Sequence, residues 1–204
     1  PKAKYTQYGL DRFELTTLAP TIMLRYTRGL KGVINSDFEY DKLQFLYTQP
    51  ILIGSFGRTL ITVEAGKTFQ AVPLSLLSAI PGNESYGQVY GTFSQVDYYE
   101  FVTDQYATMN WEHHFNGWIL NKIPLVKKLK LREVGFLRGA YGDLSDKSIA
   151  MNRSTINYFT PNKQIYYEYG FGIENIGYGN IRPIRVDFNW RGNYNDIPGA
   201  RKFG

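Results

Sequence analysis

The segment Glu112-His113-His114 is the first place to look for acid–base or metal chemistry, because it contains both histidines of the chain. Neighbouring residues of a β-strand point to opposite faces, so Glu112 and His114 could share a metal ion but His113 could not join them. The chain has no cysteine, which argues against a cysteine-ligated zinc site and a thiol nucleophile. We therefore predict no metal site and interpret Glu112 and His114 as polar strand residues.

Pairs of carboxylates are the other candidates for catalysis. Glu168 with Glu174, or Glu112 with Glu133, could act as a general acid and base, but nothing in the sequence fixes their spacing. Salt bridges with arginines are the simpler expectation, and the candidates are Arg138, Arg185 and Arg191. The chain has no Gly-x-Ser-x-Gly turn, P-loop, dinucleotide fingerprint or calcium loop. The sequence therefore predicts no enzyme, no catalytic residue and no cofactor.

The composition favours a β-protein. The chain contains 17 Tyr, 13 Phe and 3 Trp among 204 residues, together with 20 Gly. Strands favour aromatic side chains, and membrane β-barrels place them in girdles at both interfaces. A soluble β-sandwich is also rich in Tyr, so composition alone leaves both classes open.

The charge of the chain could indicate nucleic-acid binding, because the net charge is +5 and the pI about 9.2. A nucleic-acid-binding domain clusters such charge on one face. The densest basic run here is only residues 122–132, with Lys127, Lys128 and Lys130 inside it. We therefore predict no nucleic-acid partner, and a solvated loop near a membrane surface explains the run equally well.

Alternation of apolar and polar residues predicts the strands, and residues 184–194 give the clearest case. No apolar run reaches the 18 or so residues of a membrane helix. One face of this segment is apolar, with aromatic residues towards one end: Ile184, Val186, Phe188, Trp190, Gly192 and Tyr194. The other face carries three charges and two amides, which suits a wet lumen: Arg185, Asp187, Asn189, Arg191 and Asn193. We expect four residues to face lipid: Ile184, Val186, Phe188 and Trp190. We expect four others to line the lumen: Arg185, Asp187, Asn189 and Arg191.

Five segments alternate in a similar way, at residues 21–27, 42–48, 61–65, 106–115 and 165–174, and residues 129–141 alternate less well because Glu133 and Arg138 fall on opposite faces. Residues 165–174 form a hairpin with residues 184–194 through the Gly-rich connector 175–180. Four more aromatic residues are predicted to face lipid: Trp111, Tyr167, Tyr169 and Phe171. Three more acidic residues are predicted to line the lumen: Glu112, Glu168 and Glu174. These seven strands imply an eighth.

The lengths of the connectors predict how these strands would sit in a membrane. Outer-membrane barrels have short periplasmic turns and longer extracellular loops. If the turn at 175–180 is periplasmic, the alternating strand direction makes the short link 50–54 periplasmic too. The long links 66–103 and 142–164 then become extracellular, and the first of them could fold into the lumen. A soluble sandwich has no reason to sort its loops in this way.

The connector 116–128 fits this scheme less well, because it is of medium length at the periplasmic end. Its apolar residues alternate with basic neighbours, and they include Trp118, Ile119, Leu120, Ile123, Leu125 and Val126. This composition predicts a short amphipathic segment at the membrane surface.

The ends of the sequence indicate a part of a barrel. The chain begins with Pro1, which indicates processing or cutting, and residues 200–204 look like the start of a further strand. An open sheet cannot sit in lipid, because its edges leave unpaired backbone groups. We therefore expect residues 1–204 to be the C-terminal portion of one barrel domain, which needs the remaining barrel strands to close.

A family resemblance rests on short segments along nearly the whole chain. They are Glu64-Ala65-Gly66-Lys67-Thr68, Val72-Pro73-Leu74, Pro81-Gly82-Asn83-Glu84, Tyr98-Tyr99-Glu100-Phe101-Val102-Thr103-Asp104, Trp111-Glu112-His113-His114-Phe115-Asn116-Gly117, Asp187-Phe188-Asn189-Trp190-Arg191-Gly192 and Ala200-Arg201-Lys202-Phe203-Gly204. In these segments the chain resembles the barrel region of a family of uncharacterised outer-membrane proteins. Members usually carry an N-terminal carboxypeptidase-regulatory-like domain, which these residues do not include. The resemblance implies a barrel but no particular activity.

The chain is more distantly similar to the sixteen-stranded barrels that assemble outer-membrane proteins or secrete partner proteins. Counted back from the C-terminus, residues 66–103 correspond to the sixth extracellular loop, which in that superfamily is long and folds into the lumen. The superfamily has an Arg-Gly-aromatic tip in this loop. In this chain the Arg-Gly pairs lie outside residues 66–103, and they begin at Arg28, Arg138 and Arg191. This departure weakens the case for assembly activity, whereas the barrel architecture does not depend on it.

The sequence therefore predicts an all-β fold, an antiparallel transmembrane β-barrel of which this chain supplies about eight of sixteen strands. We expect a protein of the bacterial outer membrane, surrounded by lipid and in contact with other envelope proteins. Protein assembly, secretion or scaffolding of an envelope complex is the first functional hypothesis. A passive channel or a structural subunit of such a complex is the second, and a soluble glycan-binding β-sandwich is the third.

Overall fold

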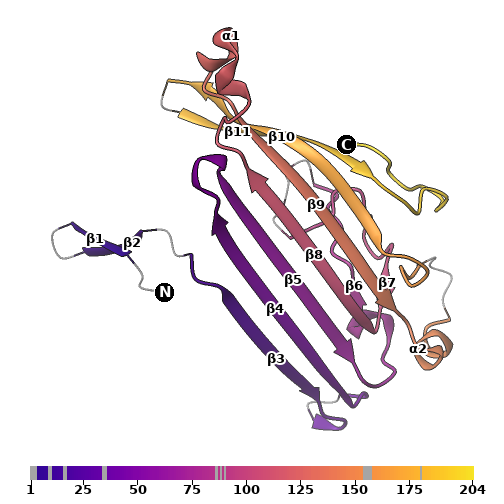
Figure 1. Cartoon of the computed structure of the whole chain (residues 1–204). Coiled ribbons are helices and arrows are strands. Elements are labelled where there is room, and N and C mark those ends of the chain that lie inside the picture. The colour runs from indigo at the N-terminus through magenta and orange to yellow at the C-terminus, as the bar shows by residue number, and fades with distance from the viewer. Residues whose placement is uncertain are drawn as a thin grey trace.

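A computed structural model describes residues 4–8, 11–15, 18–33, 36–85, 87, 89, 91–153, 158–179 and 181–204. Parts of the predicted loops, and Asn180 of the predicted 175–180 turn, lie outside these residues. The fold is all-β and antiparallel, as predicted. One sheet of seven strands has the order β11-β10-β9-β8-β5-β4-β3, in which neighbours in space follow each other along the chain (Figure 1).

These seven strands overlap all seven predicted segments. Their bounds are β3 Thr21–Gly29, β4 Tyr40–Leu52, β5 Arg58–Thr68, β8 Gln105–His114, β9 Arg132–Asp143, β10 Tyr166–Tyr178 and β11 Ile181–Arg191. The sheet is open: β3 forms one edge, and residues 202–204 run antiparallel along the other. On that edge the backbone of Gly204 exchanges hydrogen bonds with Asn189, and Arg191 N donates to Lys202 O.

The remaining elements are short. Two small two-stranded sheets pair β1 (Lys4–Tyr8) with β2 (Asp11–Leu15), and β6 (Ser78–Ala79) with β7 (Val102–Thr103). The helices are α1 (Pro124–Lys127) and α2 (Asp146–Met151), with 3-10 turns at η2 (Gly54–Phe56), η3 (Leu74–Leu76) and η4 (Leu120–Lys122). Among the described residues, no helix is long and apolar enough to cross a membrane.

Two boundaries differ from the prediction. The predicted turn at 175–180 is mostly strand, because β10 continues to Tyr178 through a β-bulge. Asn175 and Gly177 take positive φ there (65° and 158°), which lets the strand absorb extra residues without ending. At the other end, β11 stops at Arg191, so Tyr194 does not join the apolar face. Its ring packs instead against Phe101 and Tyr166 under the loops.

The strand register separates the side chains of the sheet into two faces. One, here called the apolar face, carries large apolar side chains that are all at least 38% exposed: Ile22, Leu24, Tyr26, Leu43, Phe45, Ile51, Met109, Leu137, Tyr141, Tyr167, Tyr169, Phe171, Ile184 and Val186. The opposite face, here called the polar face, holds most of the charged and amide side chains of the strands. The distribution is the reverse of a soluble sheet, which buries its apolar face.

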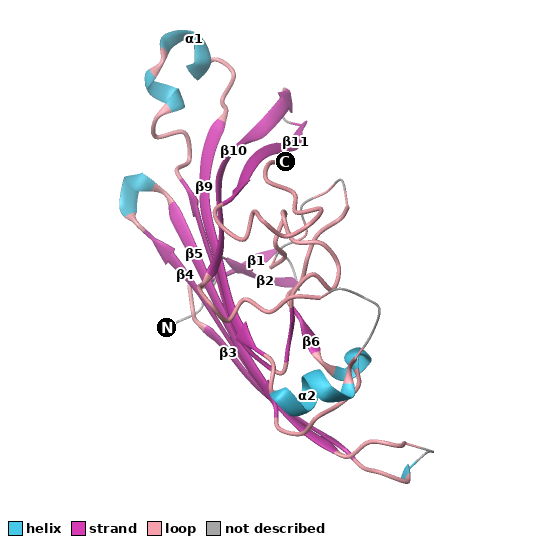
Figure 2. Cartoon of the chain, turned by 90° about the vertical axis from the view of Figure 1, so that its right-hand side faces the viewer, coloured by secondary structure: helices cyan, strands magenta, loops and turns pink. Residues whose placement is uncertain are grey.

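Loops cover the polar face over β8 to β11. Figure 2 shows the segment between β5 and β8 (residues 69–104, here called the long loop), the β9–β10 connection and the C-terminal tail on this side of the sheet. The buried core forms beneath them. Phe93, Val96 and Phe101 of the long loop pack with Ala140 and Tyr166 of the sheet. Over β3 the polar face is open, and Met23 there is exposed.

The two longest connectors lie at the same end of the sheet, although the connector from β8 to β9 at the opposite end is longer than the β3–β4 link. The long loop and the β9–β10 connection lie at one end of the sheet, together with the β3–β4 link (Figure 1). The tight β4–β5 and β10–β11 turns lie at the opposite end, together with α1.

Candidate functional site

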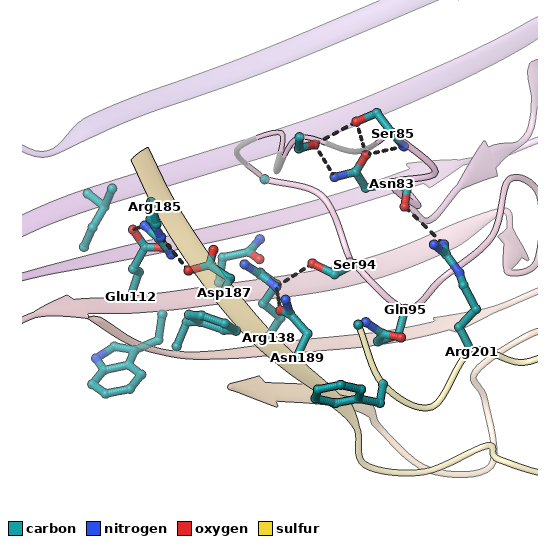
Figure 3. A pocket seen from close by; sticks show the side chains of 18 of the residues that line it. Asn83, Ser85, Ser94, Gln95, Glu112, Arg138, Arg185, Asp187, Asn189 and Arg201 are labelled. Carbon is teal, nitrogen blue, oxygen red and sulfur yellow. Dashed lines mark hydrogen bonds and ion pairs between the residues drawn. The ribbon is translucent and has the colours of Figure 1, made fainter. Parts of the chain in front are cut away.

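A cavity of about 560 Å³ lies between the polar face and the loops that cover it (Figure 3). The sheet contributes polar side chains from β8, β9 and β11, and the long loop and the C-terminal tail close the other side. Its polar lining includes Asn83, Ser94, Gln95, Asn110, Glu112, Arg138, Arg185, Asp187, Asn189 and Arg201.

Arg185 ties together two strands that are not neighbours in the sheet. Its guanidinium binds both carboxylate oxygens of Glu112 on β8, each at 3.0 Å, while Nε lies 2.7 Å from Asp187 Oδ1. The arginine can reach β8 because β10, between them, has glycines on this face. A Cβ on Gly172 would lie 2.0 Å from Asp187 Oδ1, and one on Gly170 would lie 2.5 Å from the Phe136 ring.

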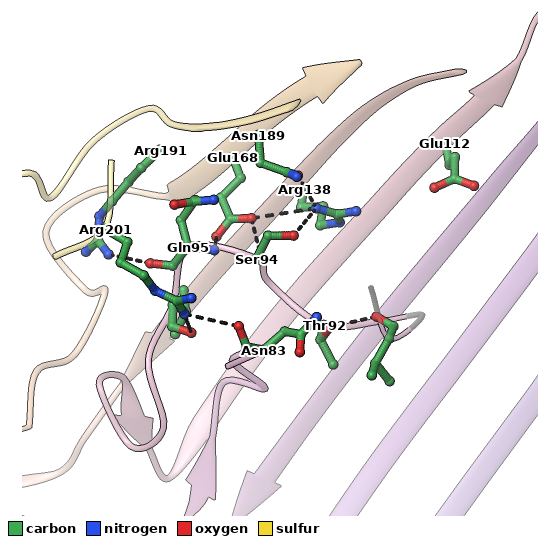
Figure 4. A network of polar contacts seen from close by, with 12 residues as sticks. Asn83, Thr92, Ser94, Gln95, Glu112, Arg138, Glu168, Asn189, Arg191 and Arg201 are labelled. Carbon is green, nitrogen blue, oxygen red and sulfur yellow. Dashed lines mark hydrogen bonds and ion pairs between the residues drawn. The ribbon is translucent and has the colours of Figure 1, made fainter. Parts of the chain in front are cut away.

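Glu168 on β10 is the point where the long loop meets the sheet (Figure 4). Its carboxylate accepts hydrogen bonds from the backbone N–H groups of Ser94 (2.9 Å) and Gln95 (2.8 Å) and from the Tyr166 hydroxyl (2.7 Å). Arg138 Nη1 lies 3.7 Å from the same carboxylate and donates to Ser94 Oγ. The side chain of Glu168 is fully buried, so this set of partners offsets the cost of removing a charge from water.

Two further arginines, which follow the long loop in the sequence, also bind it. Arg191 Nη2 lies 2.5 Å from Glu100 Oε1, and its Nη1 donates to the Gln95 carbonyl. Arg201 Nη2 donates to the carbonyls of Asn83 and Val96, each at 3.1 Å. The charged side chains of the site thus bind the long loop to the sheet, and the carboxylates of Glu112, Glu168 and Glu100 all accept hydrogen bonds within the protein. The arrangement suits mechanical support of the loop.

Comparison with known proteins gives a family but no function. Residues 1–147 match the model of the C-terminal domain of DUF5686, a family of unknown function. The chain belongs to this family. Neither the curated proteins nor the solved structures gave a significant match. The match to the DUF5686 C-terminal domain covers β3 to β9 and the long loop, whereas β10 and β11 follow it.

Six of the seven predicted lumen residues gather around the cavity and the loop contacts: Glu112, Glu168, Arg185, Asp187, Asn189 and Arg191. The seventh, Glu174, lies apart, where its Oε2 is 3.1 Å from His114 Nδ1. The other ring nitrogen of His114 lies 2.8 Å from Glu112 Oε1. Among the described residues no group of side chains is arranged to hold a metal ion.

The eight residues predicted to face lipid all lie on the apolar face. Ile184, Val186, Tyr167, Tyr169 and Phe171 are exposed. Phe188, Trp190 and Trp111 are half-buried. The rings form a ladder in which Phe171 lies 5.2 Å from Phe188 and 5.7 Å from Trp190, centroid to centroid.

His113 is a polar residue on the apolar face, and both nitrogens of its ring have hydrogen-bond partners. Its Nδ1 lies 2.6 Å from Thr59 Oγ1, and its Nε2 lies 2.9 Å from the Phe56 carbonyl. The ring also packs edge-on against Phe115. Because both nitrogens have partners, the imidazole adds little polarity to this face.

The loop side of the site could not be predicted from the sequence. Ser94 and Gln95 contribute backbone N–H groups, which every residue except proline has, so their types carry no signal. Glu100 and Asn83 lie in the resemblance segments quoted above, but no periodic pattern marks them as partners of Arg191 and Arg201.

Proposed function

We propose that this DUF5686 domain forms part of a β-barrel in the bacterial outer membrane, with lipid as the neighbour of its apolar face. The observation that carries the proposal is the reversed distribution of side chains in the sheet. Large apolar residues are exposed on one face of six of the seven strands, while the charged side chains of Arg138, Glu168 and Arg191 are buried on the other face. A lipid-exposed barrel requires this arrangement. The strands have 9 to 13 residues, enough to cross a bilayer at a tilt.

A soluble glycan-binding sandwich is the weaker candidate. A sandwich buries the apolar faces of two sheets against each other. In the part of the chain that the structure describes, no second sheet covers the apolar face, and Leu24 is 69% exposed. Water would therefore be an unfavourable solvent for this face.

Within the membrane, we propose a plugged barrel that acts in protein assembly, secretion or scaffolding of an envelope complex. A passive channel needs an open lumen. Here the long loop lies on the polar face and is held by Glu168, Arg191 and Arg201, which favours a plug that moves only when its contacts break. Further strands would pair with the free edge of β3, because lipid cannot satisfy its backbone groups.

Proteolysis of intact cells that produce the full-length protein tests the membrane proposal. One protease-cleavable tag is placed after Lys163 in the β9–β10 connection, and another after Gly179 in the β10–β11 turn. We expect the first tag to be cut from outside, and the second only after the envelope is opened. Cleavage of both tags only in lysed cells, or recovery of the protein from the soluble fraction without detergent, would reject the barrel.

A further inference from the structure

A patch of basic and apolar side chains projects from the end of the sheet that carries the tight turns. We call residues 116–130 the basic segment; it contains η4 and α1 and joins β8 to β9. Its lysines are Lys122, Lys127, Lys128 and Lys130, and it has no acidic residue. Between them stand apolar side chains that project into solvent, with Leu125 80% exposed and Ile123 and Leu129 also exposed.

The fold holds this segment in place. Glu133 Oε1 accepts hydrogen bonds from the backbone N–H groups of Ile119 (3.0 Å) and Leu120. Asn175 Nδ2 donates to the Lys130 carbonyl at 2.6 Å, and Arg182 Nη1 donates to the Leu129 carbonyl. These contacts attach the segment to β9 and to the β10–β11 hairpin, so its position relative to the sheet is fixed by the fold.

The hairpin and the β4–β5 turn enlarge the patch. Tyr178 and Ile181 at the tip of the hairpin are 94% and 77% exposed. On the other side, the Phe56 ring lies 5.1 Å from the Trp118 ring, and Lys122 Nζ lies 4.0 Å from the centroid of that indole. The basic segment is therefore continuous with the apolar face at the level where a membrane protein has its aromatic girdle.

We infer that the basic segment binds the headgroups of anionic phospholipids, with its apolar side chains inserted among the upper acyl chains. Lysines that surround exposed Leu and Trp side chains are the composition of an interfacial anchor, because the ammonium groups reach phosphates while the apolar groups enter the bilayer. An acidic protein would match the charge but not Leu125, Tyr178 and Ile181. The inference rests on the proposed membrane location. In that orientation the patch faces the periplasmic leaflet.

Lipid retention tests this inference. The full-length protein in a neutral detergent is mixed with phosphatidylglycerol or phosphatidylcholine, and native mass spectrometry counts the retained lipids. Wild type should retain phosphatidylglycerol preferentially. The variant K122Q/K127Q/K128Q/K130Q should lose this preference, with at least about tenfold weaker apparent affinity. The matched control K31Q/K147Q/R153Q/K163Q, in loops at the opposite end, should behave as wild type.

The outcomes separate the inference from the proposed function. A protein that needs detergent but has no preference for phosphatidylglycerol overturns the inference alone. If the protein stays in solution without detergent, the proposed membrane location is rejected together with the inference. Loss of poly-glutamate binding in the four-lysine variant, with lipid retention unchanged, would assign the patch to an acidic protein instead and also overturn the inference.

The depth of Trp118 provides a second measurement that does not depend on the lysines. In a W111F/W190F protein, Trp118 is the remaining tryptophan. In bilayers that contain brominated phosphatidylglycerol its fluorescence should be quenched, and the further change L125Q should reduce the quenching. An unquenched Trp118 in a correctly inserted protein would overturn the inference.

Discussion

Glu168 Oε1 on β10 lies 2.8 Å from the backbone nitrogen of Gln95, a residue 73 positions earlier in the chain. A buried carboxylate thus holds the backbone of the long loop against the sheet. Because the donor is a main-chain group, the contact depends on the position of the loop and not on its side chains. This relationship leads to the first of four predictions.

The change Glu168→Gln should loosen the long loop without removing the sheet. An amide has one acceptor oxygen, so one of the two N–H groups at Ser94 and Gln95 loses its partner. We expect the free energy of unfolding in detergent to fall by about 2 kcal/mol. Hydrogen exchange at residues 94–95 should accelerate more than exchange in β9. Glu39→Gln, which removes an exposed ion pair with Arg28, is the control and should change stability much less than Glu168→Gln does. Equal effects of both changes would contradict this role for Glu168.

Arg185 and Glu112 should be energetically coupled across the intervening strands. The two side chains form a bidentate ion pair that is largely buried. Removal of either partner therefore leaves the other charge without its counter-ion. A double-mutant cycle with Arg185→Met and Glu112→Gln, followed by urea unfolding in detergent micelles, should give a coupling energy of about 1 to 3 kcal/mol. Arg185→Lys should recover only part of it, because lysine cannot make two parallel hydrogen bonds. Additive single effects would show that the pair has no role in stability.

Arginine scanning on β3 distinguishes lipid from water on the two faces. Leu24 and Met23 are neighbours, both exposed, on the apolar and polar faces respectively. In a membrane, Leu24→Arg should cost about 2–4 kcal/mol and reduce the amount of inserted protein, whereas Met23→Arg should have little effect. Insertion is read from resistance to extraction with carbonate and from the heat-dependent gel shift of folded barrels. In a water-soluble protein both changes would be tolerated equally.

Arg191 should keep the plug closed. Its side chain is completely buried against Glu100, and Arg191→Met leaves that carboxylate without its cation. If the free energy that favours the closed position of the loop falls by about 3 kcal/mol, the open fraction should rise by about a hundredfold. Conductance of the full-length protein in planar bilayers measures this fraction. Arg28→Met, at the exposed ion pair on β3, is the matched control. Unchanged conductance in Arg191→Met would mean that the loop is not the barrier.

The sequence was a good guide to the sheet, because alternation is a local property. The period of two alone places Tyr169, Phe171, Phe188 and Trp190 on one face, whereas the pairing of Tyr169 with Trp190 also depends on the bulge and the turn. The alternation of side chains gave wrong predictions where the backbone departs from regular strand geometry. Tyr194 keeps the period but takes a positive φ of 55°, and its ring turns into the core. Asn175 and Gly177 look like turn residues, yet the bulge keeps them in β10.

The candidate site was predictable only on the side of the sheet. Polar strand residues such as Asp187 and Asn189 were identified by their position in the alternation. Arg201 could not be assigned to the loop from the sequence, because its acceptors at Asn83 and Val96 are carbonyls more than 100 residues away. Contacts of this kind depend on the completed fold and leave no local pattern.

The long loop is held by residues that follow it in the chain: Glu100 meets Arg191 91 residues later, and Asn83 meets Arg201 118 residues later. A chain made from its N-terminus therefore exposes the loop before its anchors exist. The loop can take its final position only once β9, β10 and β11 have formed, so its docking belongs to the last stage of folding. Until then its apolar residues Phe93, Val96 and Phe101 remain uncovered, and a chain at this stage is prone to aggregate.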